Sequence, residues 1–566
     1  MTPSRIRQFV AGILFLPLVI LGQEAEKPGS IAGAVLNSVT GEGVRSASVS
    51  LRGKPAAGQV INSSQSPLQT VTTNAEGRFE FQNVTPGLYF IFTQKSGFIP
   101  DRRSTQSSKA TVVGPGQAVT GVELKLTPQA IVAGRVLNAD GEPVQGAFVA
   151  ALRKSYAGGK RRWMPVGNSQ TNDLGEYRLI NLEPGSILVR ANPPAQMAPA
   201  GTSRPSQQGA PAGEARPVAT YYPGVLEASE AAHLDARAGQ TASNIDIQLQ
   251  HATGFTVKGR ITDPEASAES RYLISAARTD EIAFGSSAMT QANPDGSFEI
   301  RGLVPGSYLL RTMVAGRGSP DMQFRQGLAQ VEVTANVEGV AIQITGPVKL
   351  GGVVAIENVP PGQKVDISQI YVVFTAAEFG TGGMRYPPVV KQDGTWSTDG
   401  VTPGSYRVSA MMRSFDGPTA YVSAVTAAGQ DILGKYIDIT AGGPGPINIT
   451  LSMDSSTITG KLESGLEPSA RTGQLTAVSI PASERFRGVD QLQSVVVGED
   501  GTFTLKGVRP GEHLVFVFNN YEYGALSDPD FLKKVESKAV KVKTNAGETA
   551  TAQLKVSEWP EGMAVQ

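Results

Sequence analysis

The chain has 566 residues and contains no cysteine. This absence excludes disulfide bonds, a lipid-modified cysteine, a thiolate metal site and a cysteine nucleophile. Lysine plus arginine and aspartate plus glutamate each number 50, so the formal net charge is zero. A chain without excess positive charge has no electrostatic basis for binding nucleic acid or an acidic membrane surface. We therefore expect no nucleic-acid partner, and the sequence indicates no cofactor.

Long hydrophobic runs are also lacking, apart from one at the N-terminus. Two arginines precede an apolar run at residues 9–21, which Pro17 interrupts, and a polar stretch follows. This arrangement is typical of a signal peptide, and the run is shorter than the ~20 residues that span a bilayer as a helix. We predict a signal peptide at residues 1–22, cleaved near Gly22 or alternatively near Ala25. The mature chain is then exported without a membrane span; an uncleaved anchor is the other interpretation.

Glycine and proline are abundant, with 64 and 37 residues. Many of them belong to a motif that occurs five times, first at residues 76–89 as Glu-Gly-Arg-Phe-Glu-Phe-Gln-Asn-Val-Thr-Pro-Gly-Leu-Tyr. In every copy a Pro-Gly pair begins nine residues after the first glycine. The first glycines are Gly77, Gly175, Gly296, Gly394 and Gly501, and the pairs are Pro86-Gly87, Pro184-Gly185, Pro305-Gly306, Pro403-Gly404 and Pro510-Gly511.

The motif has a direct physical interpretation. Its first glycine suits a tight turn, because glycine accepts a positive φ without a Cβ clash. Apolar and polar residues then alternate, as in Phe298-Glu299-Ile300, which is typical of a strand with one buried face. The Pro-Gly pair fits the two central positions of a second turn, and another alternating strand follows. The motif therefore predicts a strand, a connector and a second strand.

Each copy lies within a longer repeat. The repeat opens with an apolar-x-Gly-x-apolar strand, as at residues 132–136, and closes with two strands around a turn, as at residues 539–543 and 550–556. About seven short strands in about 100 residues, without a convincing helix, indicate a β-sandwich. Periodic self-similarity of this kind indicates an array. We predict an all-β protein made of five tandem β-sandwich domains.

The domain borders follow from the repeats. We expect domains at residues 29–127, 128–251, 252–346, 347–453 and 454–557, followed by a C-terminal tail at residues 558–566. Linkers are nearly absent, because one closing strand leads directly to the next opening strand. Residues 192–220 are rich in Pro, Ala, Gly, Ser and Gln and lack periodicity, so we expect a disordered loop there in the second domain.

The motifs carry a family resemblance. The Gly-x-Val opening, the Asp-Gly-Glu-Pro-Val-Gln-Gly-Ala run at residues 140–147, and the Gly-x-Phe…Pro-Gly-x-Tyr core resemble the carboxypeptidase regulatory-like domain. This family has a transthyretin-like Greek-key sandwich and is related to collagen-adhesin B-type repeats and the carbohydrate-binding-like fold. The resemblance covers almost the whole mature chain and is closest in the first two repeats. It implies a bacterial exported protein of this fold, and it implies no catalysis.

Residue patterns for catalysis are missing. The three histidines, His233, His251 and His513, do not form the His-x-x-Glu pair through which a metallocarboxypeptidase holds zinc. There is no Gly-x-Ser-x-Gly elbow either. An acidic turn such as Asp295-Gly296 offers one or two of the six to eight oxygens that calcium takes, so we interpret it as a turn former. We predict a protein that is not an enzyme and has no catalytic or metal site.

Aromatic residues outside the motif are the candidates for ligand contact, because exposed rings stack on sugar faces. Trp163 is the first candidate and is expected in a long loop. Tyr221 and Tyr222 come next, followed by Tyr521 and Tyr523. A loop aromatic in a sandwich also often covers the open end of the core, so both interpretations stay open. Trp396 replaces the motif phenylalanine and is expected in the core.

We therefore expect an exported, non-enzymatic array that acts as a binding or spacer module at the cell envelope, in the periplasm, on the outer surface or outside the cell. Its partner would be an envelope protein or a polysaccharide, engaged through loops or an exposed strand edge. One alternative is a carbohydrate-binding protein that uses loop aromatics. Another is an accessory chain of a separate peptidase or outer-membrane receptor.

Overall fold

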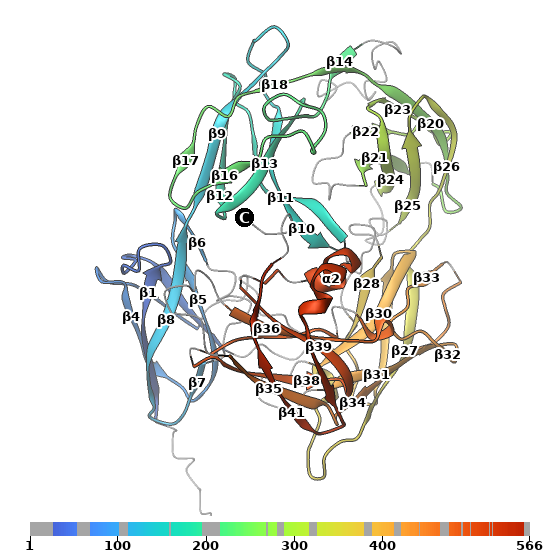
Figure 1. Cartoon of the computed structure of the whole chain (residues 1–566). Coiled ribbons are helices and arrows are strands. Elements are labelled where there is room, and N and C mark those ends of the chain that lie inside the picture. Colours follow the sequence, from blue (N-terminus) through green and yellow to red (C-terminus); the bar gives the residue numbers. More distant parts are fainter. Residues whose placement is uncertain are drawn as a thin grey trace, which may run out of the picture. The chain divides into compact units, whose positions relative to one another are not determined.

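The structure is a computed structural model that describes residues 27–53, 68–100, 111–157, 160–194, 215–267, 270–279, 288–315, 325–377, 388–412, 420–440, 442–463, 475–487, 491–498, 500–519, 521–522 and 524–559. It is almost entirely β, as the sequence predicted (Figure 1). Most strands of each repeat form two sheets, and residues 215–217 and 251–253 form a further two-stranded sheet. The sandwich of repeat 1 forms one compact unit, and repeats 2 to 5 form a second. The predicted signal peptide lies outside the described residues.

The first two repeats contain the following strands. Repeat 1 has β1 (Gly29–Asn37), β2 (Ser48–Gly53), β3 (Gln69–Thr72), β4 (Arg78–Val84), β5 (Gly87–Gln94), β6 (Phe98–Pro100), β7 (Thr111–Val113) and β8 (Ala118–Pro128). Repeat 2, with the strand that follows it, has β9 (Ala130–Leu137), β10 (Phe148–Ala157), β11 (Lys160–Gln170), β12 (Glu176–Leu182), β13 (Gly185–Asn192), β14 (Ala215–Pro217), β15 (Thr220–Tyr221), β16 (Leu234–Ala236), β17 (Thr241–Ala242), β18 (Ile247–Gln248) and β19 (His251–Thr253).

The other three repeats follow the same plan. Repeat 3 has β20 (Phe255–Thr262), β21 (Arg271–Arg278), β22 (Ala288–Gln291), β23 (Ser297–Leu303), β24 (Gly306–Ala315), β25 (Gln326–Val333) and β26 (Val337–Gln343). Repeat 4 has β27 (Val348–Glu357), η2 (Ile367–Gln369), β28 (Ile370–Ala376), β29 (Thr395–Val401), β30 (Gly404–Met412), β31 (Tyr421–Ala427), β32 (Gln430–Asp431), β33 (Ile437–Ile439) and β34 (Ile447–Ser452). Repeat 5 has β35 (Ser456–Leu462), β36 (Leu475–Pro481), η4 (Glu484–Phe486), β37 (Gln493–Val496), β38 (Thr502–Val508), β39 (Gly511–Asn519), η6 (Ala525–Ser527), α2 (Pro529–Val535), η7 (Glu536–Lys538), β40 (Val540–Thr544), β41 (Thr549–Leu554) and β42 (Val556–Ser557).

The two sheets of a repeat have a fixed strand order. In the first sheet the opening strand lies between the first motif strand, to which it is antiparallel, and a closing strand, to which it is parallel. These sheets contain β4-β1-β8, β12-β9-β17, β23-β20-β26, β29-β27-β34 and β38-β35-β41. The second sheet is built around the second motif strand and contains β3-β2-β5-β7, β11-β10-β13, β22-β21-β24-β25, β28-β30-β33 or β37-β36-β39-β40. The core of each repeat lies between its two sheets.

The first motif glycine forms the predicted turn in all five repeats. Its φ lies between 70° and 83°, the left-handed region in which a side chain is strained. Its carbonyl oxygen accepts a hydrogen bond of 2.8–2.9 Å from a backbone N–H of the opening strand. The turn therefore ties the first motif strand to the start of the repeat. The residues concerned are Gly77, Gly175, Gly296, Gly394 and Gly501.

The glycine of each opening strand faces the motif aromatic across the sheet. The pairs are Gly33–Phe79, Gly134–Tyr177, Gly259–Phe298, Gly352–Trp396 and Gly460–Phe503. A Cβ at Gly134 would lie 2.0 Å from the Ile245 carbonyl oxygen, and one at Gly352 would lie 1.7 Å from that of Ile447. The glycine thus permits a close approach of the closing strand while the aromatic ring fills the core. Trp396 is 2% exposed, which confirms its predicted place in the core.

The Pro-Gly-x-Tyr end of the motif is held by a side chain to backbone hydrogen bond. In repeats 1, 3 and 4 the tyrosine hydroxyl donates to the carbonyl oxygen four residues earlier. The pairs are Tyr89–Thr85 at 2.6 Å, Tyr308–Val304 at 2.9 Å and Tyr406–Thr402 at 2.7 Å. Repeat 5 has His513 at this position, with its Nε2 2.7 Å from the Arg509 carbonyl oxygen. The motif is therefore a structural device that closes the connector between its two strands.

Two expectations about secondary structure were wrong. A helix, α2, is present in repeat 5, although the sequence showed no convincing one. Residues 215–217 of the predicted disordered loop form β14, which pairs antiparallel with β19, while residues 195–214 lie outside the described part of the chain. The described helices include none that is long and apolar enough to cross a membrane.

Candidate functional site

Two of the three predicted ligand residues of repeat 2, Trp163 and Tyr221, lie on the outer face of its second sheet. Trp163 is in strand β11, so its expected place in a long loop is wrong. Its side chain is 8% exposed and belongs to a small cluster with Tyr221, Leu152, Leu188 and Ala231. This second cluster is separate from the main core of the repeat. The structure therefore brings Trp163 and Tyr221 together, mostly out of contact with solvent.

Polar groups surround the indole ring. The Lys154 ammonium lies 4.9 Å from the ring centroid, in cation–π geometry. The imidazole of His233 lies 6.0 Å from the ring, and its Nδ1 is 3.0 Å from the Ser186 hydroxyl. Burial, followed by the nearby charge of Arg161, lowers the pKa of Lys154. A partly buried cation already lies over the ring, so little aromatic surface is open to stack on a sugar.

The other predicted tyrosines are distributed differently. Tyr221 is 3% exposed, and the Arg190 guanidinium lies 5.9 Å from its ring centroid. Tyr222 packs against the main core of repeat 2, away from Trp163. Tyr521 packs against a cluster in repeat 5, and Tyr523 lies outside the described residues. Ligand contact by Trp163, Tyr221 or Tyr222 stays a prediction.

Repeat 5 has a corresponding covered face that the sequence analysis missed. Here η6, α2 and η7 follow β39, just as the segment with Tyr221 follows β13 in repeat 2. Phe531 and Leu532 of α2 pack with Phe516 and Phe518 of β39, and Trp559 packs against them. Trp559 was assigned to the tail, yet its ring centroid lies 4.6 Å from that of Phe531.

The start of α2 has a clear local cause. The Asp528 side chain accepts hydrogen bonds from the backbone N–H groups of Asp530 at 2.8 Å and Phe531 at 3.2 Å. Pro529 occupies the first turn, where its missing N–H costs nothing. The Ser-Asp-Pro-Asp run is thus a helix start of the kind that a search for N-caps would have found.

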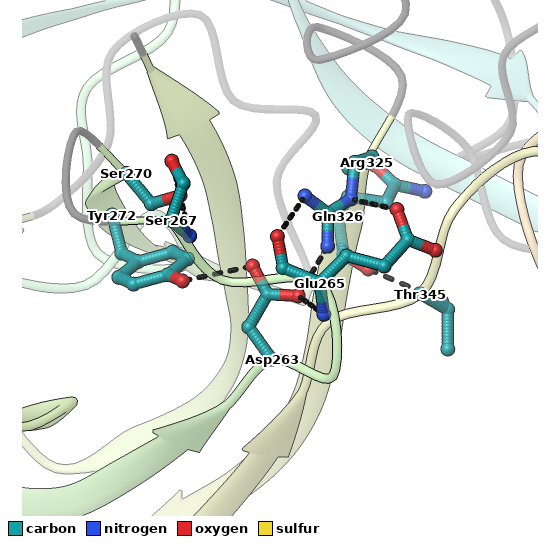
Figure 2. Close-up of polar contacts among 8 residues, drawn as sticks. All are labelled: Asp263, Glu265, Ser267, Ser270, Tyr272, Arg325, Gln326 and Thr345. Carbon is teal, nitrogen blue, oxygen red and sulfur yellow. Dashed lines mark hydrogen bonds and ion pairs between the residues drawn. The ribbon is translucent and has the colours of Figure 1, made fainter.

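A buried polar cluster in repeat 3 was also missed (Figure 2). The Asp263 side chain is 1% exposed and forms an ion pair with Arg325, which is 9% exposed. The Tyr272 hydroxyl donates to Asp263 Oδ2 at 2.8 Å, and the Glu265 N–H donates to Oδ1 at 3.0 Å. Burial and this hydrogen bond raise the pKa of Tyr272.

This cluster joins three strands at one end of the sandwich. Asp263 follows β20, Tyr272 lies in β21, and Arg325 precedes β25. Both oxygens of the carboxylate accept hydrogen bonds, and the guanidinium contacts the Glu265 carbonyl oxygen at 3.4 Å. A carboxylate that is fully engaged in this way fits a structural clamp better than a group that moves protons.

The acidic turns behave as turn formers. Asp393 Oδ1 accepts from the Thr395 N–H at 2.9 Å and from its hydroxyl at 2.6 Å. These hydrogen bonds from Thr395 lower the pKa of Asp393. Asp295 and Asp500 make the same local contacts. Within the described residues, no three His, Asp or Glu side chains gather in a way that could hold a metal ion.

Comparison with known proteins finds similar solved structures at low sequence identity. No family model matches the chain, and no curated protein matches it. Among solved structures it is similar to the Bacillus anthracis TIE protein, with 14% identity over 57% of this chain and 51% of that chain and a TM-score of 0.16. It is also similar to BcpA, the major pilin subunit of Bacillus cereus (10% identity, 56% and 99% covered, TM-score 0.15). A third is GBS52, the minor pilin of Streptococcus agalactiae (11% identity, 40% and 96% covered, TM-score 0.20). The chain spans about half of the TIE protein.

Proposed function

We propose that the protein is an exported, non-enzymatic binding or spacer module of the cell envelope. The observation that carries the proposal is the succession of sandwiches with short joints. Strand β26 ends at Gln343 and β27 begins at Val348, and β34 ends at Ser452 and β35 begins at Ser456. Short joints between folded domains limit motion between neighbours, which suits a protein that presents surfaces at a set reach.

The motif supports membership of the carboxypeptidase regulatory-like family as part of this proposal. Its fixed positions all have structural roles. The first glycine forms the turn, the aromatic residue packs opposite a glycine, and the tyrosine holds the connector by a hydrogen bond. None of these roles is chemical. The motif therefore accounts for a shared fold, and any recognition would take place on loops, strand edges and the covered faces.

The carbohydrate-binding alternative depends on Trp163. With its side chain 8% exposed and the Lys154 ammonium over the ring, little of the indole surface is accessible to a sugar. The binding or spacer role is therefore the stronger candidate. The accessory role beside a peptidase or receptor is compatible with the same structure and differs in the identity of the partner.

A binding screen with the mature chain tests the proposal. The full chain from residue 23 is applied to a glycan array and, in parallel, crosslinked in envelope preparations of the source cells. The test variant is Trp163→Ala. The control variant is Tyr436→Ala, which removes a tyrosine of repeat 4 that is 42% exposed. The proposal predicts a saturable complex with one envelope protein that both variants keep. Saturable glycan binding that only Trp163→Ala abolishes would replace it with the carbohydrate-binding role.

A further inference from the structure

The hairpin of β10 and β11 in repeat 2 extends beyond its own sheet. Strand β10 has 10 residues, whereas its counterparts β2, β21, β28 and β36 have 6, 8, 7 and 7. Only Phe148 to Leu152 of β10 pair with β13, while Arg153 to Ala157 pair with β11 alone. The end of this hairpin, which we call the tip, consists of Arg153 to Ala157 and the paired residues Lys160 to Met164. It is a two-stranded projection, and such a ribbon is marginally stable without further packing.

Tyr156 at the tip is buried by residues of repeat 5. Its side chain is 9% exposed and belongs to the cluster formed by β39 and α2. The ring lies 5.8 Å from that of Phe531, edge to face at 76°, which is a favourable aromatic arrangement. Burial raises the pKa of Tyr156 to about 12. A residue of repeat 2 thus completes an apolar cluster of repeat 5.

Hydrogen bonds and a close backbone approach also support the contact between the tip and repeat 5. The Tyr156 N–H donates to Glu522 Oε1 at 3.2 Å, and the Ser155 hydroxyl also bonds this carboxylate. Opposite Tyr156 stands Gly524, whose φ is 87°. A Cβ at position 524 would lie 3.6 Å from the Tyr156 Cβ, so the two backbones approach closely.

Charge is complementary across the contact. The tip carries Arg153 and Arg161, which act on the Glu522 carboxylate from the hairpin side. Repeat 5 contributes Glu522 and Asp528, both of which act on Tyr156. Two arginines and one aromatic ring of the hairpin end therefore meet two carboxylates and an aromatic cluster of repeat 5, as in interfaces with a central apolar anchor.

We propose that the tip of repeat 2 docks onto the covered face of repeat 5 within the same chain. Repeats that are far apart in sequence are then held together, so the array does not act as a freely extending series of domains. Tyr156 is the side chain that repeat 5 buries. The Glu522 carboxylate accepts a hydrogen bond from the hairpin backbone, and α2 packs against the Tyr156 ring. This contact is independent of what the protein binds.

The absence of cysteine allows a direct test by engineered crosslinking. The pair Tyr156→Cys with Gly524→Cys has a Cβ separation of 3.6 Å, within the ~3.5–4.5 Å that a disulfide requires. Tyr156→Cys with Gly547→Cys is the matched control, because nothing lies within 4 Å of a Cβ at position 547. We expect the first pair to oxidise within a monomer, seen as one linked peptide by mass spectrometry, and the control pair to remain reduced.

A second measurement needs no cysteine. Hydrogen exchange of residues 525–538 is compared in the full chain and in Tyr156→Ala, with Lys154→Ala on the same strand as the control. We expect exchange on the order of tenfold faster in Tyr156→Ala only, because α2 loses part of its packing. Disulfides found only between two molecules would show that the contact forms between two copies of the chain, and this result would overturn the proposal. No disulfide together with unchanged exchange would overturn it as well.

Discussion

Acidification should weaken repeat 5 through His513, which occupies the position of the motif tyrosine. The side chain is 1% exposed. Its Nε2 lies 2.7 Å from the Arg509 carbonyl oxygen, which only accepts, so Nε2 carries the proton. Nδ1, 2.9 Å from the Ser479 hydroxyl, then accepts from it. The folded repeat thus holds a neutral imidazole, and burial lowers the pKa of His513 from its usual 6.5.

The direction and the upper limit of the effect follow from proton linkage. The unfolded chain binds a proton near pH 6.5, whereas the folded repeat resists protonation to a lower pH. The stabilising contribution is complete above pH 6.5 and is lost as the pH falls towards the folded pKa. One proton changes the free energy of unfolding by about 1.4 kcal/mol per pH unit. Acidification from about pH 7.5 to about pH 5.5 therefore removes at most ~1.4 kcal/mol through this residue.

The chain contains three tryptophans, which makes a local assay feasible. With Trp163 and Trp396 replaced by phenylalanine, fluorescence reports on Trp559 in repeat 5 during urea unfolding. The part of the stability loss that His513 causes should disappear in His513→Tyr, whose hydroxyl can donate to the Arg509 carbonyl as the motif tyrosine does in repeats 1, 3 and 4. An equal loss of stability in His513→Tyr would refute the reasoning, because another group would then be titrating.

Three further substitutions test the structural roles by denaturation of the full chain. Gly352→Ala should destabilise repeat 4 by at least about 2 kcal/mol, because its Cβ would lie 1.7 Å from a carbonyl oxygen. The control Gly442→Ala has open space around its Cβ and should change stability by less than ~0.5 kcal/mol. Asp263→Asn should lower the free energy of unfolding by about 3 kcal/mol, because it breaks a buried ion pair. Asp235→Asn, in a surface pair that is 64% exposed, should lower it by under ~1 kcal/mol. Similar losses for both variants would contradict a structural role for the Asp263–Arg325 pair. Tyr406→Phe should cost about 1 kcal/mol through the lost hydrogen bond to the backbone, and an unchanged midpoint would show that this bond is dispensable.

The repeated features were predictable from the sequence because their causes are local. The spacing from Gly296 to Pro305 implied a turn, a strand and a second turn, and the structure has this order in every repeat. The glycine of each opening strand was visible as a pattern. Its partner, the motif aromatic, became clear only from the strand register.

The features that were missed depend on contacts between distant residues. Asp263 and Arg325 are 62 residues apart, and neither belongs to a motif. Trp163 was expected in a loop, but pairing with β10 makes this segment a strand. The short helix α2 escaped attention because 7 residues show little periodicity, although its Asp-Pro start was readable.

Cell fractionation tests most directly our proposal that the chain functions outside the cytoplasm as an envelope module. Antibodies against the full chain would follow it in fractions of the source cells, with N-terminal sequencing of the recovered protein. We expect to recover the chain from the envelope or the medium, with its N-terminus near residue 23. Recovery of the full-length chain, starting at Met1, from the cytoplasmic fraction would contradict it.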